Sequence, residues 1–346
     1  MRNPLVDCLK AVASQIIVLH HLVLYSPMAK ELQPLWPGLF AVLGDQARYV
    51  VQVFLVIGGY LAAQSMWKLL AQPQASELTT ATKLIWQRYI RLAKPYWVAI
   101  AAAAALAAGL SWFDAFPDLV EPPTLAQIFS HIFMVHDIVG VHALSAGVWY
   151  VAIDFQLYAL LVLMVWFSRN LNGTALLAWL EPARVWMLLA LGLTVCSLFW
   201  WNTNPKLDEW GIYFFGAYGL GILSFWAVKK HRRAPVMALV ACMVLAALWF
   251  NWRERLILTG ITALLLMGSD LIRPWVEKVH SRAIQTLGDI SYSVFLIHYP
   301  LLMLTSGVVV WLGYDNLGFH VAAFVGTWLL SIAAGAVMHH TIERSA

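Results

Sequence analysis

Ten apolar segments, each close to the roughly 20 residues that a helix needs to cross a bilayer, follow one another along the chain. They cover about 5–25, 48–68, 87–110, 145–167, 184–201, 210–228, 234–250, 255–272, 286–311 and 317–339. A membrane β-barrel would instead show short segments of alternating polarity. We therefore predict an all-α fold, a polytopic membrane helix bundle of about ten transmembrane helices, forming a single domain over residues 1–346.

The composition agrees with a membrane protein and excludes several other classes. Of the 346 residues, 61% are hydrophobic and 12% are charged, which is about half the charged fraction of a soluble domain. The net charge of +4 is small, and the basic residues lie between apolar segments. We expect membrane lipid as a partner and no nucleic acid. The three cysteines lack metal-ligand spacing, so we expect neither a metal site nor a disulfide framework.

The distribution of lysine and arginine predicts the orientation, because cytoplasmic loops carry an excess of both residues. With the N-terminus in the cytoplasm, sixteen of the 22 lie on the cytoplasmic side and five on the outer side, with Lys10 inside the first segment. Ten crossings return the chain to its starting side. We therefore predict that the N-terminus and the C-terminus are both cytoplasmic.

The first apolar segment carries ionisable residues, which are costly inside a membrane and usually face a cavity, a partner or a substrate path. Lys10 and His21 are eleven residues apart. In a helix they fall within roughly 20° of the same face, about 16 Å apart along the axis. This spacing predicts the two ends of one elongated binding slot. The neighbouring His20 lies about 100° away on the helix, and a structural role is favoured for it.

The longest predicted outer loop, about 111–144, contains no lysine or arginine. Residues 125–133 within it are predicted to form a short amphipathic helix at the outer interface. The loop is either a solvated connector with an interfacial anchor or a lid that binds the acceptor, and both interpretations stay open.

Six stretches resemble, in the same order, the motifs of the acyltransferase type 3 family of integral membrane acyltransferases. The first is Asp7, Lys10 and, after ten residues, His21, where the family has Asp-x-x-Arg, ten residues and His. The other five are Val53–Leu61, Arg88–Tyr96, Trp149–Tyr158, Leu287–Pro300 and Ile342–Arg344. Each match alone is weak, but the six together extend over nearly the whole chain.

Three positions depart from the family pattern. Lys10 stands in place of Arg, Gly58 in place of Ser, and Asp154 in place of Glu. Lysine keeps the positive charge but loses the planar fork of a guanidinium, and aspartate keeps the carboxylate on a shorter side chain. Since the charges are preserved, we expect a divergent but active member.

The resemblance implies an O-acyltransferase of a bacterial inner membrane that modifies polysaccharides or related lipids. It would move an acyl group, usually acetyl, from cytosolic acetyl-CoA to a hydroxyl of a glycan or glycolipid. Acetyl-CoA is then a donor substrate, and no metal is needed. Two alternatives are a non-catalytic partner in polysaccharide assembly and an ion- or proton-coupled transporter that uses Lys10, His21 and Asp154 as a relay. A transporter would be expected to show inverted repeats, and none is apparent.

The predicted donor site lies at the cytoplasmic ends of the helices. Coenzyme A is a polyanion, and Arg88 and Arg91 could bind its phosphates, with Lys10 as a further cation; an ordinary positive-inside anchor is the alternative. Tyr292 and His298 complete the predicted set. For His298, capping of carbonyls freed by Pro300 is the competing interpretation.

His21 is the predicted general base, because imidazole titrates near neutrality and can accept a hydroxyl proton. An acyl-histidine intermediate is the less favoured version. Asp7, one turn before Lys10, is predicted to hold that ammonium. Asp154 needs a partner if it is buried, and we expect Lys10 or His21 in that role.

The acceptor is predicted to contact two aromatic residues of the fourth segment. Tyr158 follows Asp154 by four residues and shares its helix face, and Trp149 lies near the outer end of the segment. Simple packing is the alternative role for Tyr158.

Overall fold

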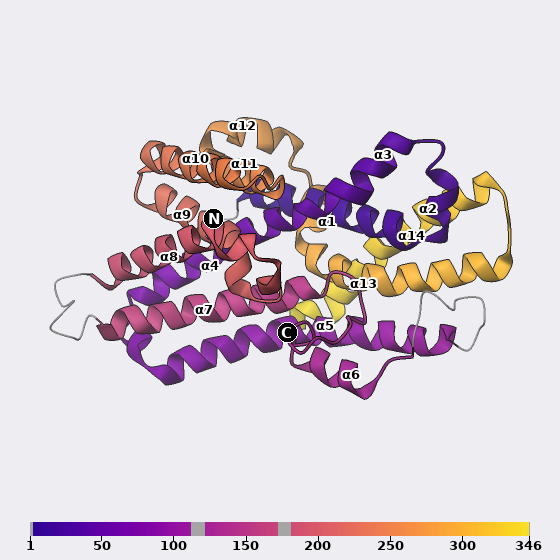
Figure 1. Cartoon of the computed structure of the whole chain (residues 1–346), viewed down its shortest axis with the longest axis horizontal. Helices are drawn as coiled ribbons and strands as arrows, with labels where there is room; N and C mark the ends of the chain where they lie inside the picture. Colours follow the sequence, from indigo (N-terminus) through magenta and orange to yellow (C-terminus); the bar gives the residue numbers. More distant parts are fainter. Residues whose placement is uncertain (1–2, 112–121, 172–180, 346) are drawn as a thin grey trace. The chain divides into compact units, whose positions relative to one another are not determined.

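The protein is described here by a computed structural model, which covers residues 3–111, 122–171 and 181–345. All regular elements in these ranges are helices (Figure 1), as predicted. Nine helices among these residues are long and apolar enough to cross a membrane. They are α1 (Pro4–Tyr25), α4 (Val51–Leu70), α5 (Leu78–Leu110), α7 (Trp149–Leu171), α8 (Pro182–Phe199), α9 (Gly211–Lys229), α10 (Arg233–Phe250), α13 (Arg282–Leu312) and α14 (Leu317–Thr341).

Five further helices are short. They are α2 (Pro27–Leu32), α3 (Pro37–Ala41), α6 (Leu125–Ile132), α11 (Arg255–Met267) and α12 (Ser269–Val279). Helix α6 is the predicted interfacial helix, and Thr124 and Gln127 close its first turn with a reciprocal capping box. Residues 112–121 of the same predicted loop lie outside the described ranges.

The eighth predicted segment, 255–272, is a broken helix rather than a straight one. Helix α11 has 13 residues and is therefore about 20 Å long, less than the roughly 30 Å of a hydrocarbon core. After Gly268 the helix axis turns by 93° into α12. Ser269 and Asp270 open the new helix, and no residue of α12 is buried. The described chain therefore has nine crossing helices, or ten if α11 and α12 together count as one.

The chain divides into two compact units that interleave along the sequence. The first contains Met1–Val6, Val51–Ile90 and Ala152–Val279, and the second contains Asp7–Val50, Arg91–Val151 and His280–Ala346. Neither unit is one continuous stretch, and helices α1, α5 and α7 each contribute residues to both.

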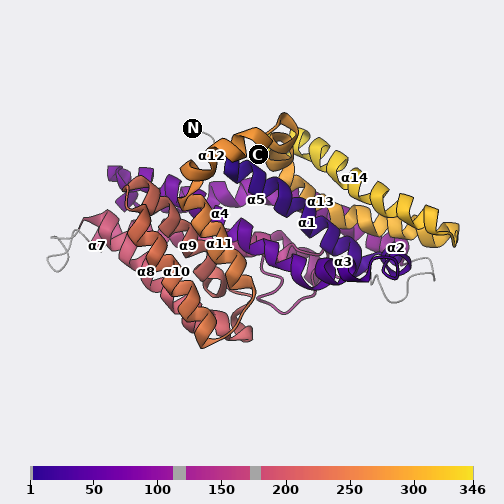
Figure 2. The ribbon, with the colours of Figure 1, turned by 90° about the horizontal axis from the view of Figure 1, so that it is seen from above.

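Helix α9 is the centre of the first unit. It packs against α4, α8, α10 and α11, and Figures 1 and 2 draw α8, α9, α10 and α11 alongside one another. Glycines permit the closest approach. A Cβ atom on Gly59 of α4 would lie 1.9 Å from the Tyr218 carbonyl oxygen, and one on Gly221 of α9 would lie 2.0 Å from the Val56 oxygen.

Two arginines tie the ends of the helices around α9. Arg253 donates from Nη2 to the carbonyls of Leu198 and Ala247 at 2.8 and 3.3 Å, near the C-terminal ends of α8 and α10. A cation is favourable at these ends because the last carbonyls of a helix carry partial negative charge. Arg255 donates to the Tyr213 hydroxyl at 2.6 Å. Both guanidinium groups also donate to the side-chain oxygen of Asn202.

The second unit is built on the packing of α1, α13 and α14. Val18 and Leu22 of α1 form a buried cluster with Ile290, Val294 and Leu302 of α13, and residues of α14 cover it. The backbones of α1 and α13 also approach closely, since a Cβ atom on Gly288 would lie 2.8 Å from the Asp7 carbonyl oxygen. Helix α1 is thus held firmly along its length.

The broken helix determines on which side of the membrane the chain ends. Both flanks of α10 and α11 are basic, with Lys229–Arg233 before them and Arg273–Arg282 after them, so the positive-inside rule favours a crossing by the α11–α12 pair. We expect a fluorescent protein fused after Ser345 to fluoresce, as it does only in the cytoplasm. Alkaline phosphatase fused after Asn251 should be active, as it is only outside. Phosphatase activity from a fusion at Ser345 would contradict ten crossings.

Candidate functional site

Two histidines from distant parts of the chain meet inside the second unit. His21 of α1 and His298 of α13 lie 2.7 Å apart, from Nδ1 of the first to Nε2 of the second. The planes of the two rings lie within 6° of each other, and the ring centroids are 4.9 Å apart. Both side chains are buried. His21 Nε2 has no hydrogen-bond partner in the described ranges, and it is not fully buried.

Small and aromatic residues fix the position of this pair. Gly147, just before α7, has a φ of +79°, a backbone conformation that favours glycine. A Cβ atom there would lie 3.3 Å from His21 Cε1 and 3.0 Å from Phe295 Cζ. The Phe295 ring also makes an edge contact with Tyr150. Gly147 therefore leaves space for the imidazole and for the aromatic ring beside it.

His298 is placed differently from the competing interpretation, in which it caps carbonyls freed by Pro300. A proline at 300 removes the donor to the carbonyl four residues earlier, that of Leu296. His298 instead directs Nε2 to His21. Its Nδ1 is buried and makes no hydrogen bond in the described ranges.

The other residues of the first predicted motif lie in the same unit. Asp7 is buried, and its Oδ2 lies 3.3 Å from Nε2 of His280, which precedes α13. Lys10 is half-buried, and its predicted pairing with Asp7 stays a prediction. His20 donates from Nδ1 to the Leu43 carbonyl, 2.7 Å away, as a structural histidine would.

A second cluster of polar residues lies in the first unit. Arg88 of α5 donates from Nη2 to Asp154 Oδ2 of α7 at 2.5 Å, and its guanidinium lies 5.1 Å from the centre of the Tyr158 ring. Asp154 is buried, and the Arg88 side chain is 27% exposed. The expected partner of Asp154, Lys10 or His21, was wrong. Helix periodicity predicts which face of a helix carries a residue, but it does not predict which helix packs against that face.

The glycine that replaces the family's serine borders this cluster. A Cβ atom on Gly58 would lie 3.4 Å from Asp154 Oδ1 and 3.2 Å from the ring of Tyr218. Tyr218 of α9 is buried beside the carboxylate. Tyr218 was not among the predicted site residues, but the glycines at 216, 219 and 221 predict a close helix contact there.

The predicted donor-site residues have unequal surroundings. Arg91 is exposed, while Lys94 donates to the Ser345 carbonyl at 3.2 Å. The Tyr292 hydroxyl donates to the Leu92 carbonyl at 3.0 Å. The neighbouring Arg91 carbonyl has no helical N–H donor, because residue 95 is a proline. Tyr292 thus ties α13 to α5, and the exposed side chain of Arg91 is accessible to a soluble anion.

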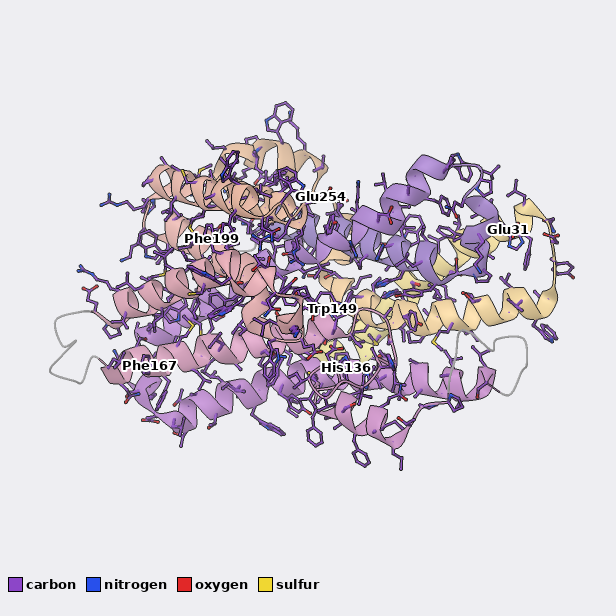
Figure 3. All side chains as sticks on the ribbon, in the orientation of Figure 1. Glu31, His136, Trp149, Phe167, Phe199 and Glu254 are labelled. Atoms are coloured by element: carbon purple, nitrogen blue, oxygen red, sulfur yellow. The ribbon has the colours of Figure 1, made fainter. Side chains whose placement is uncertain are left out.

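His131 of α6 and His136, which follows this helix, form a buried pair of histidines. The two rings stack with centroids 4.1 Å apart, and both side chains are fully buried. Figure 3 labels His136. His131 contacts the Gln127 carbonyl through Nδ1 at 2.7 Å and accepts the Leu144 N–H at Nε2. It therefore joins α6 to the chain that leads to α7 and Trp149, which is also labelled in Figure 3.

The described ranges contain no group of three or more histidine, cysteine, aspartate or glutamate residues that could hold a metal ion. An imidazole pair with one unused nitrogen is suited to proton transfer.

Comparison with known proteins gives a family assignment. The family model described as an acyltransferase domain, that of the acyltransferase type 3 family, matches residues 3–336. No curated protein and no solved structure matches the chain.

The buried histidine pair should make the fold sensitive to acid. Burial lowers the pKa of both His131 and His136 from 6.5 to about 4, so between these values the unfolded chain binds protons that the folded protein does not. The free energy of unfolding should therefore fall as the pH drops below 6.5, by on the order of 3 kcal/mol for each histidine. The measurement is denaturant unfolding in detergent between pH 7 and pH 4.

A double variant, His131→Gln with His136→Phe, should lose most of this dependence. His136→Phe keeps a stacked ring, and His136 makes no hydrogen bond of good geometry, although Asp137 lies 3.3 Å from its Nε2. His142→Gln changes an exposed histidine of the same segment and should behave as wild type. An unchanged pH profile in the double variant would rule out these histidines as the cause.

Proposed function

The chain belongs to the acyltransferase type 3 family, and we propose that it transfers an acyl group, acetyl in the first instance, from cytosolic acyl-CoA to a hydroxyl of a glycan or lipid-linked saccharide. Its apolar helices make it an integral membrane acyltransferase. We place it in a bacterial inner membrane, since the basic segments then face the cytosol that supplies the donor.

The observation that carries the proposed mechanism is the pairing of His21 with His298. One nitrogen of His21 is held by the partner ring at 2.7 Å, while the other has no hydrogen-bond partner in the described ranges. A histidine general base uses its two nitrogens differently: a hydrogen bond to one nitrogen holds the ring in place, and the other nitrogen accepts the proton of the substrate. The pair lies among buried residues, where competing water is scarce.

The proposed mechanism uses one tautomer of the pair. His298 carries its hydrogen on Nδ1, so its Nε2 has a lone pair and accepts the Nδ1–H of His21. The lone pair of His21 is then on Nε2, the nitrogen that has no hydrogen-bond partner in the described ranges.

In the proposed reaction, His21 Nε2 removes the proton of the acceptor hydroxyl as its oxygen attacks the thioester carbonyl carbon. The new carbon–oxygen bond forms, and the tetrahedral intermediate collapses with cleavage of the carbon–sulfur bond. The proton passes from His21 to the leaving sulfur, so that the products are the ester and coenzyme A. His21 returns to its starting state.

At the donor end, we propose different roles for Arg88 and Arg91. Arg88 forms an ion pair with Asp154 and lies against the Tyr158 ring. We therefore assign Arg88 a structural role, which is to hold α5 against α7. Arg91 is exposed three residues further and is proposed to bind coenzyme A phosphate. Lys10 remains a candidate for a second cation at the donor, as the family motif implies.

The transporter alternative needs Lys10, His21 and Asp154 as one relay. The contact of Asp154 with Arg88 gives that carboxylate a different role. An activity assay distinguishes an enzyme from a non-catalytic partner, because only an enzyme accelerates the release of coenzyme A thiol from acetyl-CoA.

The histidine pair is tested by release of coenzyme A from acetyl-CoA in purified protein, with mass spectrometry of surface glycans and lipids to find the acceptor. His21→Ala should lower kcat/KM by about 10²–10⁴-fold, the usual contribution of a general base. His298→Leu should lower kcat with little change in KM for acetyl-CoA. His298→Gln should recover part of the rate, because its amide oxygen can accept the His21 Nδ1–H.

The control is His20→Gln, which changes the adjacent imidazole on the same helix and should keep full activity. Full activity of a folded His21→Ala protein would disprove the catalytic role. An acyl adduct on His21, found when the acceptor is withheld, would replace direct transfer with an acyl-histidine mechanism.

The two arginines should fail in different ways. Arg91→Gln should raise KM for acetyl-CoA about tenfold, the worth of one charge-assisted hydrogen bond to phosphate, without lowering the melting temperature. Arg88→Gln should lower the melting temperature, because it leaves the buried Asp154 carboxylate without its cation. An unchanged KM in Arg91→Gln would refute the phosphate-binding role.

A further inference from the structure

A cavity of about 430 Å³ opens in the first unit and is lined by none of the candidate site residues. Its walls come from the start of α8, the end of α9, the start of α10 and Trp67 near the end of α4. Helices α8, α9 and α10 lie next to one another in Figures 1 and 2. The volume lies within the range of ordinary small-molecule sites.

One wall of the cavity is apolar and reaches the surface at Leu188. Leu188, Leu191 and Leu223 line it; Leu188 is 59% exposed, Leu191 is half-buried and Leu223 is buried. In a membrane protein, an exposed leucine on a crossing helix lies against lipid. The cavity is thus open towards acyl chains of the bilayer.

The other end of the cavity is polar and carries a net positive charge. Arg184 and Lys230 line it with a single carboxylate, Glu181. The Lys230 ammonium lies 5.0 Å from the centre of the Trp67 ring, and Arg184 Nε lies 3.5 Å from Glu181 Oε2 with both side chains well exposed. Exposed pairs of this kind are weak, so Arg184 can bind another anion at little cost.

The combination of an apolar wall and a cationic end matches one kind of ligand. Trp67 and Trp226, both in the lining, belong to the residue type that marks the level of lipid headgroups. This end of α9 continues into Lys229, Lys230, Arg232 and Arg233, the basic side that faces the anionic cytoplasmic leaflet. A soluble anion would use the charges but not the leucine wall.

We propose that this cavity binds one anionic phospholipid of the cytoplasmic leaflet. Its phosphate lies between Arg184 and Lys230, and the upper part of an acyl chain lies along Leu188, Leu191 and Leu223. The bound lipid joins α8, α9 and α10 at their basic ends. The proposal does not depend on the acyl-transfer reaction, because none of the residues assigned to catalysis or to donor binding lines the cavity.

The test is photocrosslinking in nanodiscs with photoreactive phosphatidylglycerol or photoreactive phosphatidylcholine, followed by peptide mapping. Phosphatidylglycerol should label peptides that contain residues 183–191 and 223–239. The double variant Arg184→Gln, Lys230→Gln should weaken this labelling, with a loss of affinity of roughly 30-fold for the two charges. Ala183→Trp, which fills the cavity without changing charge, should also reduce it.

The matched control is Lys68→Gln with Lys83→Gln, which removes two exposed charges that do not line the cavity and should leave labelling unchanged. Equal labelling by the two lipids would overturn the proposal, as would full labelling of the Arg184 and Lys230 double variant. Displacement of phosphatidylglycerol by acetyl-CoA would overturn it in favour of a donor pocket.

Discussion

An ionisable side chain inside hydrocarbon must find its partner within the protein, because no water is available to solvate it. Two polar pairs meet that requirement with groups from distant parts of the chain. His21 meets His298, and Arg88 meets Asp154. The crossing helices are arranged around these pairs, since a helix that shifted by one turn would strand a polar group in an apolar core.

The two pairs meet the requirement in different ways. The Arg88–Asp154 pair is a full ion pair supported by an aromatic ring, and its stable form carries opposite charges. The histidine pair needs no charge, because one neutral imidazole can donate to another. A neutral pair can accept a proton transiently and release it again, whereas a tight ion pair resists either change. This difference is why the proposed chemistry belongs to His21 and the structural role to Arg88.

The sequence was sufficient for most of the fold but only for part of the candidate site. Apolar length predicts the crossing helices, because a bilayer imposes one length on all of them. Apolar length did not reveal the helix break after Met267, although Gly268 is a typical helix end and Ser269 and Asp270 are typical of a helix start. Motif resemblance selected His21 and His298 separately, but their contact depends on the packing of α1 on α13. Because the sequence does not reveal which helices pack together, the partner of Asp154 was predicted wrongly and Tyr218 was not predicted at all.

The glycine contact between α4 and α9 has a consequence for biosynthesis. The two helices are separated by about 140 residues, a stretch that takes roughly 10–30 s to synthesise. During that interval α4 is already in the membrane with the flat surface of Gly59 uncovered, and its partner has not yet left the ribosome. Insertion of the first helices must therefore precede their final docking, and the nascent chain depends on lipid or on the insertion machinery to shield that surface. A substitution at Gly59 or Gly221 would act late, on a chain already inserted, and would send a complete but unassembled protein to membrane quality control.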